Sequence, residues 1–233
     1  PPLFRSEAAA PGENGMKLVY RLLELLFPRK CVLCQILLTP DQTDLCRDCR
    51  SVVPEWNRGG RVLPGLDGYA SVWYYEDLVR DSLLRFKFSG KRHYAKAYGR
   101  LLAMTISREL PETDLITWVP VSALRRHFRG YDQSRLLAKE AAGELGMNPI
   151  PLLRKLRHNR AQSGITDPSL RRENVRGKYR AIDPEQIRGK RIILVDDILT
   201  TGATACECAR ILRSAGAQQV FLAVMASGKE RKQ

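Results

Sequence analysis

The chain has 233 residues, enough to bury the core of one α/β domain and a small appendage. Its 39 lysines and arginines outnumber its 25 acidic residues, which leaves a formal charge of +14. This excess indicates a polyanionic partner such as nucleic acid or a phosphorylated ligand, although a basic proteome or plain solubility also explains it. No run approaches the roughly 20 apolar residues of a membrane-spanning helix, and the start lacks a secretory signal pattern, so we expect a cytoplasmic protein.

The N-terminal stretch has two parts. Residues 1–15 are polar, carry Pro and Gly and precede Met16, and we expect an expression remnant or a disordered tail there. The next segment, MKLVYRLLELLFPRK, repeats apolar residues at helical spacing before Pro28 and predicts a short amphipathic helix. We expect its apolar face to dock on the body of the protein rather than to touch a membrane surface.

Four cysteines form two C-x-x-C pairs separated by eleven residues: Cys31, Cys34, Cys46 and Cys49. Each pair places two thiolates on one turn, and two pairs complete a closed tetrahedron, so the spacing predicts a structural zinc ion. A redox pair needs only one such turn, and a reducing compartment disfavours disulfides. We expect residues 16–60 to form a small module in which the metal replaces a missing core.

Strands and helices alternate over the rest of the chain and predict a main domain at residues 61–233. Apolar strands alternating with amphipathic helices are typical of a doubly wound parallel sheet covered on both faces. The expected strands are Tyr69–Tyr75, Leu115–Val121, Asn148–Arg157, Arg191–Val195 and Val220–Met225, and the expected helices are Leu78–Phe88, Tyr94–Leu110, Asp132–Leu145 and Ala203–Ala215.

Two features of this domain stand outside the regular pattern. Residues 157–179 are polar and basic, lack periodicity and exceed a typical connection, which predicts a functional or disordered loop. Cys206 and Cys208 lie two residues apart in an expected helix and so point to different faces, which favours packing in or near the core over a shared ligand.

The stretch RIILVDDILTTGAT places two acids at the end of an expected strand, where ligands bind in open parallel sheets. The small residues that follow lead into a helix whose first amides are unpaired, which indicates an anion site. The carboxylates repel a phosphate but accept hydrogen bonds from ribose hydroxyls, and Mg²⁺ can bridge them to the ligand. The pattern predicts a ribose 5-phosphate site made by Asp196, Asp197, Thr200, Thr201, Gly202, Ala203 and Thr204.

This stretch resembles the phosphoribosyl pyrophosphate (PRPP) motif of type I phosphoribosyltransferases, with its apolar strand, two acids and T-x-G-x-T loop. A buried strand that ends in an N-capping acid explains only one of the two acids. A phosphoacceptor receiver domain also has paired acids after a strand. There they open the domain, whereas here only 36 residues follow Asp197.

Together with the four-cysteine module, the motif resembles the ComF family, competence proteins related to phosphoribosyltransferases. The resemblance covers nearly all of Met16–Ala226 and includes VPVSALRRHFRGYDQSRLLA, where Asp132 replaces the usual Asn. It also includes RHNRAQSGITDPSLRREN, in which Gln162, Arg172 and Asn174 match.

The resemblance implies a phosphoribosyltransferase-like fold with Mg²⁺ beside the PRPP. It implies a pyrophosphate-binding turn that contains Val121, Ser122 and Arg125, and a long loop that closes over the site. It also implies a role in natural transformation, in which single-stranded DNA is handled at the inner face of the membrane. Other competence proteins would be partners, with peripheral association to the inner-membrane machinery.

The positive charge is concentrated near this site. Between Val121 and Ile192, 17 lysines and arginines face 7 acidic residues. Such a field attracts a phosphodiester backbone, and Phe128, Tyr131 or Tyr179 could stack a base. The alternative is that the arginines serve only the two phosphate groups of a small ligand. The predicted DNA-binding residues are Arg125, Arg126, Arg129, Arg157, Arg160, Arg171, Arg172, Arg176 and Lys178.

Two functions from different classes follow. The first is a DNA-processing factor that keeps a ribose-phosphate pocket as a sensor or auxiliary site, and we favour it. The second is an active phosphoribosyltransferase on an unidentified acceptor, for which no catalytic residue is assigned. A transcription regulator on the same fold is a third hypothesis, disfavoured because no helix-turn-helix segment is apparent.

Overall fold

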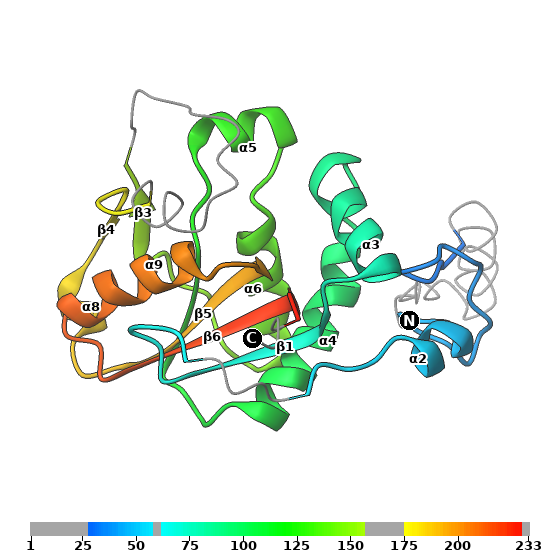
Figure 1. The fold of residues 1–233 in the computed structure, drawn as a ribbon, viewed down its shortest axis with the longest axis horizontal. Coiled ribbons are helices and arrows are strands. Elements are labelled where there is room, and N and C mark those ends of the chain that lie inside the picture. The colour runs from blue at the N-terminus through cyan, green and yellow to red at the C-terminus, as the bar shows by residue number, and fades with distance from the viewer. Residues whose placement is uncertain (1–27, 58–61, 157–174, 230–233) are drawn as a thin grey trace, which may run out of the picture. The chain divides into compact units, whose positions relative to one another are not determined.

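A computed structural model describes residues 28–57, 62–156 and 175–229 of the chain (Figure 1). The chain divides into two compact units, Pro1–Arg50 and Ser51–Gln233. The expected amphipathic helix before Pro28 lies outside the described residues. The expected boundary after residue 60 also falls outside them, so the division into residues 16–60 and 61–233 stays a prediction.

The described part of the first unit is built from tight turns. An antiparallel bridge joins Lys30 to Leu37, and the amide of Cys31 donates to the carbonyl of Ile36 at 2.8 Å. Gln35 has a φ of 67° inside this turn, a left-handed conformation that few residues with a side chain adopt. The helix α2 (Arg47–Val52) begins directly after Cys46. These turns bring the two C-x-x-C pairs together.

The second unit holds the remaining described elements. Its helices are α3 (Asp77–Phe88), α4 (Tyr94–Glu109), α5 (Ala123–Arg129), α6 (Gln133–Glu144), α8 (Pro184–Ile187) and α9 (Ala203–Ser214). Its strands are β1 (Gly68–Tyr74), β2 (Leu115–Trp118), β3 (Leu153–Lys155), β4 (Tyr179–Ala181), β5 (Arg191–Leu199) and β6 (Gln219–Ser227).

A four-stranded parallel sheet in the order β1-β6-β5-β2 forms the centre of this unit (Figure 1). Helix α9 packs with Ile192, Leu194 and Leu222 in one apolar core. Alternate side chains of a strand point to opposite faces, and α4 and α6 contact the sheet as well. The predicted doubly wound parallel sheet is confirmed.

Helices α4 and α6 approach each other closely at Gly99. A Cβ atom on Gly99 would lie 2.3 Å from the Cβ of Glu140, so a larger residue would push the helices apart. This contact matters because the first turn of α6 lies beside the end of β5, where Ser134 contacts Asp196.

Three predicted elements differ from the structure. Strand β2 ends at Trp118 rather than at Val121, because Pro120 has no amide to donate to a ladder. Strand β5 continues to Leu199 rather than ending at Val195, since the ladder with β6 continues past the aspartates.

The expected strand Asn148–Arg157 is the third difference. Only an isolated bridge from Ile116 to Pro149 extends the parallel sheet there, and Leu153–Lys155 pairs instead with β4 in an antiparallel hairpin. Pro149 and Pro151 have no amide hydrogen, so they cannot donate the backbone hydrogen bonds that a longer strand needs. Helix α5 was not expected from the sequence.

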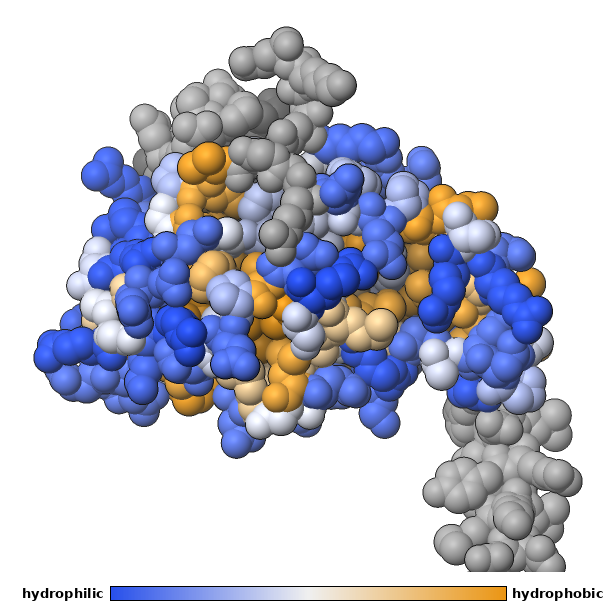
Figure 2. Space-filling view, turned by 90° about the horizontal axis from the view of Figure 1, so that it is seen from below, coloured by the Kyte–Doolittle hydropathy of each residue, from blue (hydrophilic) through white to orange (hydrophobic). Residues whose placement is uncertain are grey.

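The surface has the usual mixture of residues. On the face seen in Figure 2, hydrophilic residues predominate and apolar residues show between them in places, as on most folded domains. No helix within the described ranges has both the length and the apolar character needed to cross a bilayer.

Candidate functional site

The two aspartates lie near the carboxyl end of β5 and interact with side chains from other elements. The hydroxyl of Ser134 in α6 donates to Oδ1 of Asp196 at 2.8 Å. The ammonium of Lys87 in α3 lies 3.0 Å from Oδ1 of Asp197, and both of these side chains are largely buried, at 17% and 12% exposure. The pair is therefore held by one hydrogen bond and one ion pair from distant parts of the chain.

The environment of Asp196 changes its protonation. Burial and the neighbouring charge of Asp197 raise the pKa of Asp196 from its usual range to about 7, against the lowering effects of Ser134, the Asp197 amide and Lys87. Two adjacent carboxylates in a poorly hydrated site do not both ionise easily. Asp196 therefore exchanges its proton near neutral pH, where a ligand that donates hydrogen bonds would favour the ionised form.

The loop after the strand has the geometry of an anion site. Gly202 has a φ of 78° and is the N-cap of α9, and the amide of Cys206 donates to its carbonyl at 2.8 Å. A side chain would strain this left-handed position. A cavity of about 60 Å³ is lined by Asp196 and by the five predicted loop residues, Thr200, Thr201, Gly202, Ala203 and Thr204. Asp196 and the helix N-terminus thus meet at one pocket.

The predicted pyrophosphate turn leaves the neighbouring strand beside this pocket. The register pairs Trp118 with Val195, so Val121 and Ser122 follow β2 where the aspartates follow Val195. The amide of Val121 donates to Oδ2 of Asp132 at 3.4 Å. Arg125 lies in α5, and its side chain is outside the described part of the structure. The pyrophosphate role of this turn stays a prediction.

Asp132, which replaces the usual Asn of the family, has a structural role. It is the N-cap of α6 and accepts a hydrogen bond from the amide of Arg135 at 3.1 Å. Burial raises the pKa of its carboxyl, although the backbone hydrogen bonds oppose this shift. Asn and Asp are equally good N-caps, so the exchange preserves the turn.

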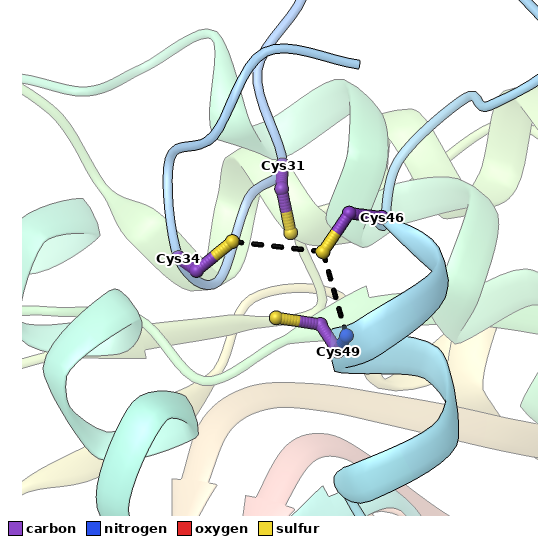
Figure 3. Close-up of side chains that lie close together, drawn as sticks. All are labelled: Cys31, Cys34, Cys46 and Cys49. Carbon is purple, nitrogen blue, oxygen red and sulfur yellow. Dashed lines mark hydrogen bonds between the residues drawn. The ribbon is translucent and has the colours of Figure 1, made fainter. Parts of the chain in front are cut away.

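The four cysteines of the first unit converge (Figure 3). Their sulfur atoms all lie within 4.8 Å of one another, with 3.6 Å between the sulfurs of Cys34 and Cys46. Cys31, Cys46 and Cys49 are buried and Cys34 is exposed. Tetrahedral zinc with bonds of about 2.3 Å holds its sulfurs about 3.8 Å apart, so the cluster fits this metal without large movement.

Backbone hydrogen bonds in the cluster stabilise the thiolate form of Cys31. Burial raises the pKa of Cys31, but hydrogen bonds from the backbone at Cys34, Cys46 and Leu33 outweigh it and bring the pKa down to about 7. The amide of Cys49 also donates to the sulfur of Cys46 at 3.4 Å. Burial and the neighbouring thiols raise the pKa of Cys49, as expected when several thiolates crowd together without a cation.

The predicted DNA-binding residues are only partly described. Arg126 and Arg129 lie on α5, while Arg176 and Lys178 precede β4. The residues of the long loop lie outside the described residues, namely Arg157, Arg160, Arg171 and Arg172, together with the family-matching Gln162 and Asn174.

Of the three aromatic residues proposed to stack a base, two are wrong. Tyr131 and Tyr179 are 6% and 4% exposed, because their rings pack into the core, whereas Phe128 is 79% exposed. The two remaining cysteines pack as expected, with Cys208 fully buried against the sheet and Cys206 half-buried beside it.

Comparisons with known proteins agree with this geometry. A model of the phosphoribosyl transferase domain matches residues 132–233. Competence protein ComFC of Bacillus subtilis is 30% identical over 173 residues, covering 74% of this chain and 67% of that protein. The chain belongs to the ComF family.

Two further relatives have similar names. Competence protein F of Haemophilus influenzae is 25% identical over 182 residues, covering 75% of each chain. DNA utilization protein YhgH of Escherichia coli is 28% identical over 183 residues, covering 75% of this chain and 74% of the relative. The solved structure of an allosteric regulatory enzyme of purine biosynthesis is 26% identical to this chain, with a TM-score of 0.39. The match covers 56% of this chain and 26% of that enzyme.

Sequence inspection missed two residues of this ComF site. Lys87 lies in α3, 110 positions before Asp197, and no local pattern distinguishes it from other helical lysines. Ser134 lies within the quoted GYDQSR segment, so the resemblance had already marked its neighbourhood. Both residues become recognisable only through their contacts with the aspartates.

Proposed function

We propose that the chain is a competence-type factor for DNA uptake in natural transformation, which binds PRPP or a related ribose 5-phosphate and also single-stranded DNA. The names of its relatives and the phosphoribosyl transferase domain support the competence role. The proposal includes Mg²⁺ with the sugar phosphate, a cytoplasmic location and other competence proteins as partners, with a peripheral association at the inner-membrane machinery.

One observation carries the sugar-phosphate part of the proposal. Asp196 lines the same cavity as the loop that caps α9, so hydrogen-bond acceptors and phosphate-binding amides stand side by side. A ribose 5-phosphate presents hydroxyl donors and an anion in a matching arrangement. A simple phosphate would gain nothing from the acids.

Calorimetry tests this assignment. PRPP titrated with Mg²⁺ should bind, ribose 5-phosphate should bind more weakly, and inorganic phosphate should bind weakest, because each step removes groups that the pocket recognises. Equal affinity for phosphate and ribose 5-phosphate would contradict a role for the acids. Omission of Mg²⁺ should lower the affinity for PRPP most, since its diphosphate carries the most charge.

Binding of single-stranded DNA should be electrostatic. The logarithm of affinity should fall with the logarithm of salt concentration, with a slope of about −0.7 for each phosphate neutralised. Reversal of Arg125, Arg126 and Arg129 to Glu should flatten the slope. A control that reverses the exposed Arg80, Lys96 and Lys190 changes net charge equally and should flatten it less. Salt-insensitive binding would contradict this surface.

The cysteine cluster should hold one structural zinc ion per chain. Because the binding free energy of such a site is also its folding free energy, chelation or Cys34→Ser should unfold the first unit and lower soluble yield. Elemental analysis of the purified protein measures the zinc directly. Folded protein without zinc would overturn this assignment, while Cys206→Ser, outside the cluster, should keep the metal.

Phosphoribosyl transfer is the second candidate function, because the family model of that domain covers Asp196–Thr204, the acid loop. Release of pyrophosphate from PRPP, assayed with candidate bases as acceptors, distinguishes the two. Turnover above the rate of PRPP hydrolysis in buffer would favour an enzyme. Binding without turnover would favour a sensor or auxiliary site.

A further inference from the structure

A second, larger cavity lies at the edge of the sheet. Its volume is about 760 Å³. Val121 of the predicted pyrophosphate turn lines it, but none of its lining residues belongs to the segment Asp196–Thr204. The bridge from Ile116 to Pro149 places its outer wall beside β2, on the side away from β5. Helices α5 and α6 and strand β3 contribute the remaining walls. Its volume falls in the range of small-molecule sites, about 300 to 1,000 Å³.

The walls of this edge pocket are strongly basic. Five cationic side chains line it: Arg126, Arg135, Lys139, Arg154 and Lys155. Its single carboxylate, Asp132, already accepts hydrogen bonds from the amides of Val121 and Arg135. Among the described residues, no carboxylate forms an ion pair within 4.0 Å of Arg126, Arg135, Lys139 or Arg154, although the charge of Asp132 is felt by Arg126 and Arg135. The pocket therefore presents positive charge that an anionic ligand could neutralise.

The hairpin beside the pocket adds an independent sign of an anion. Arg154 on β3 stands directly opposite Arg180 on β4, and both are exposed. Like charges at directly opposed positions of an antiparallel pair destabilise it. An anion bound between or beside the two guanidinium groups would remove this cost, and it would extend the positive surface beyond the pocket wall.

The floor of the pocket suits a flat, apolar group. The half-buried ring of Trp118 lies at the end of β2, with the guanidinium of Arg135 5.8 Å from its centre. Pro120, Met147 and Pro149 add apolar surface. An indole and a guanidinium plane are the surfaces on which nucleobases stack. A sugar phosphate without a base would leave this floor uncovered.

We propose that the edge pocket binds a nucleotide unit of single-stranded DNA, with its base on Trp118 and its phosphates on the surrounding cations. The inference rests on the DNA-binding part of the proposed function and locates that binding. A strand is favoured over a free nucleotide because five cations in the pocket, continued by Arg180, exceed what one phosphate needs.

Tryptophan fluorescence reports on the pocket directly. Of the three tryptophans, Trp56 and Trp73 are 7% and 3% exposed, whereas Trp118 is half-buried and lines the cavity. Titration with an oligothymidylate should quench the emission, and Trp118→Phe should abolish the quenching. Trp118→Ala should lower affinity for the oligomer at least about fivefold, as for loss of one stacked base.

A charge variant tests the phosphate contacts. Arg135→Gln with Lys139→Gln removes two cations spaced four residues apart on α6, and should reduce the magnitude of the salt slope by about 1.4. Lys96→Gln with Arg100→Gln removes the same charge at the same spacing on α4, outside the pocket. This control should leave the slope nearly unchanged. PRPP affinity should be unaffected by either pair, and thermal unfolding checks that both variants fold.

Each other outcome counts against the proposal. Salt-dependent DNA binding without quenching, unaltered by the α6 pair, would overturn the pocket assignment and leave the proposed function standing. No DNA binding by the wild type would overturn both. Thymidine monophosphate bound as tightly as the oligomer would identify a free nucleotide as the occupant. Loss of a dimer in the α6 pair, measured by light scattering, without loss of DNA affinity, would identify a second copy of the chain.

Discussion

The pocket at the end of β5 and the edge pocket beside β2 differ in how they can recognise a phosphorylated ligand. The first has a volume of about 60 Å³ and combines the carboxylate of Asp196 with helix-terminal amides. The second has about 760 Å³, five cations and an indole floor. Carboxylates next to a phosphate site penalise every anion that lacks matching hydroxyl donors, whereas exposed cations attract any polyanion. The first arrangement gives chemical selectivity and the second gives general affinity.

The largest expected effect comes from Lys87, the cation that pairs with Asp197 of β5. Lys87→Met leaves Asp197 buried without its partner and should lower the free energy of unfolding by about 3 kcal/mol at pH 8. Addition of Asp197→Asn should restore much of this loss. Urea unfolding measures both, with the exposed Lys96→Met as a control. DNA affinity should stay unchanged, and an equal loss in the double variant would show that packing, not charge, matters.

Replacement of both acids separates the two pockets by ligand. Asp196→Asn with Asp197→Asn keeps the shape but removes charged acceptors, each worth about 1.5 to 3 kcal/mol, so PRPP affinity should fall at least about tenfold. DNA affinity should stay equal or rise slightly, because negative charge is lost near a basic surface. Calorimetry measures both ligands. Asp81→Asn with Glu112→Gln removes the same charge from exposed positions and should leave PRPP binding intact.

Normal PRPP binding by the double Asn variant would refute the assignment of the acid loop. Loss of both ligands from a folded variant would mean that they share one site, and the contrast between the two pockets would fail.

The smallest expected effect is a difference in pH dependence. The pKa of Asp196 is raised to about 7, so its ionised form, which accepts ribose hydrogen bonds, increases between pH 6 and 8. PRPP affinity should therefore rise about tenfold over this interval relative to Asp196→Asn, whose profile records the titration of the ligand alone. DNA affinity should be flat, since arginine and lysine do not titrate there. A PRPP profile identical to that of the variant would contradict the shift.

The same pKa shift lowers the stability of the folded protein as pH rises, whereas it raises the affinity for PRPP. The folded state binds the Asp196 proton more tightly than the unfolded state, whose carboxyl has the ordinary pKa near 3.8. This contribution to stability is present below that value and is lost as pH rises towards about 7. Asp196→Asn should thus stabilise the protein more at pH 8 than at pH 5, as thermal unfolding at both pH values would measure.

Much of the fold could be predicted from local pattern. Apolar periodicity identified α4 within one residue at its end, and the T-x-G-x-T loop located the N-terminus of α9, because each depends on neighbours along the chain. The predicted ends of elements were wrong where hydrogen bonding to a neighbouring strand decides where the element stops. Strand β5 continues past Val195 because β6 supplies partners as far as Ser227. Arg125 and Val121 were placed in a turn, yet Arg125 lies in the helix α5.

The sequence by itself determined the chemistry of the acid loop and the grouping of the four cysteines, because each set lies in one short segment, Asp196–Thr204 and Cys31–Cys49, and its spacing dictates what it can bind. Only the tertiary structure decided that Lys87 neutralises Asp197, that Tyr131 and Tyr179 are buried, and that Trp118 shares a pocket with cations from α5, α6 and β3. These relations depend on contacts between segments far apart in the chain. Such contacts arise from the packing of helices on a sheet, and no local pattern of residues encodes them.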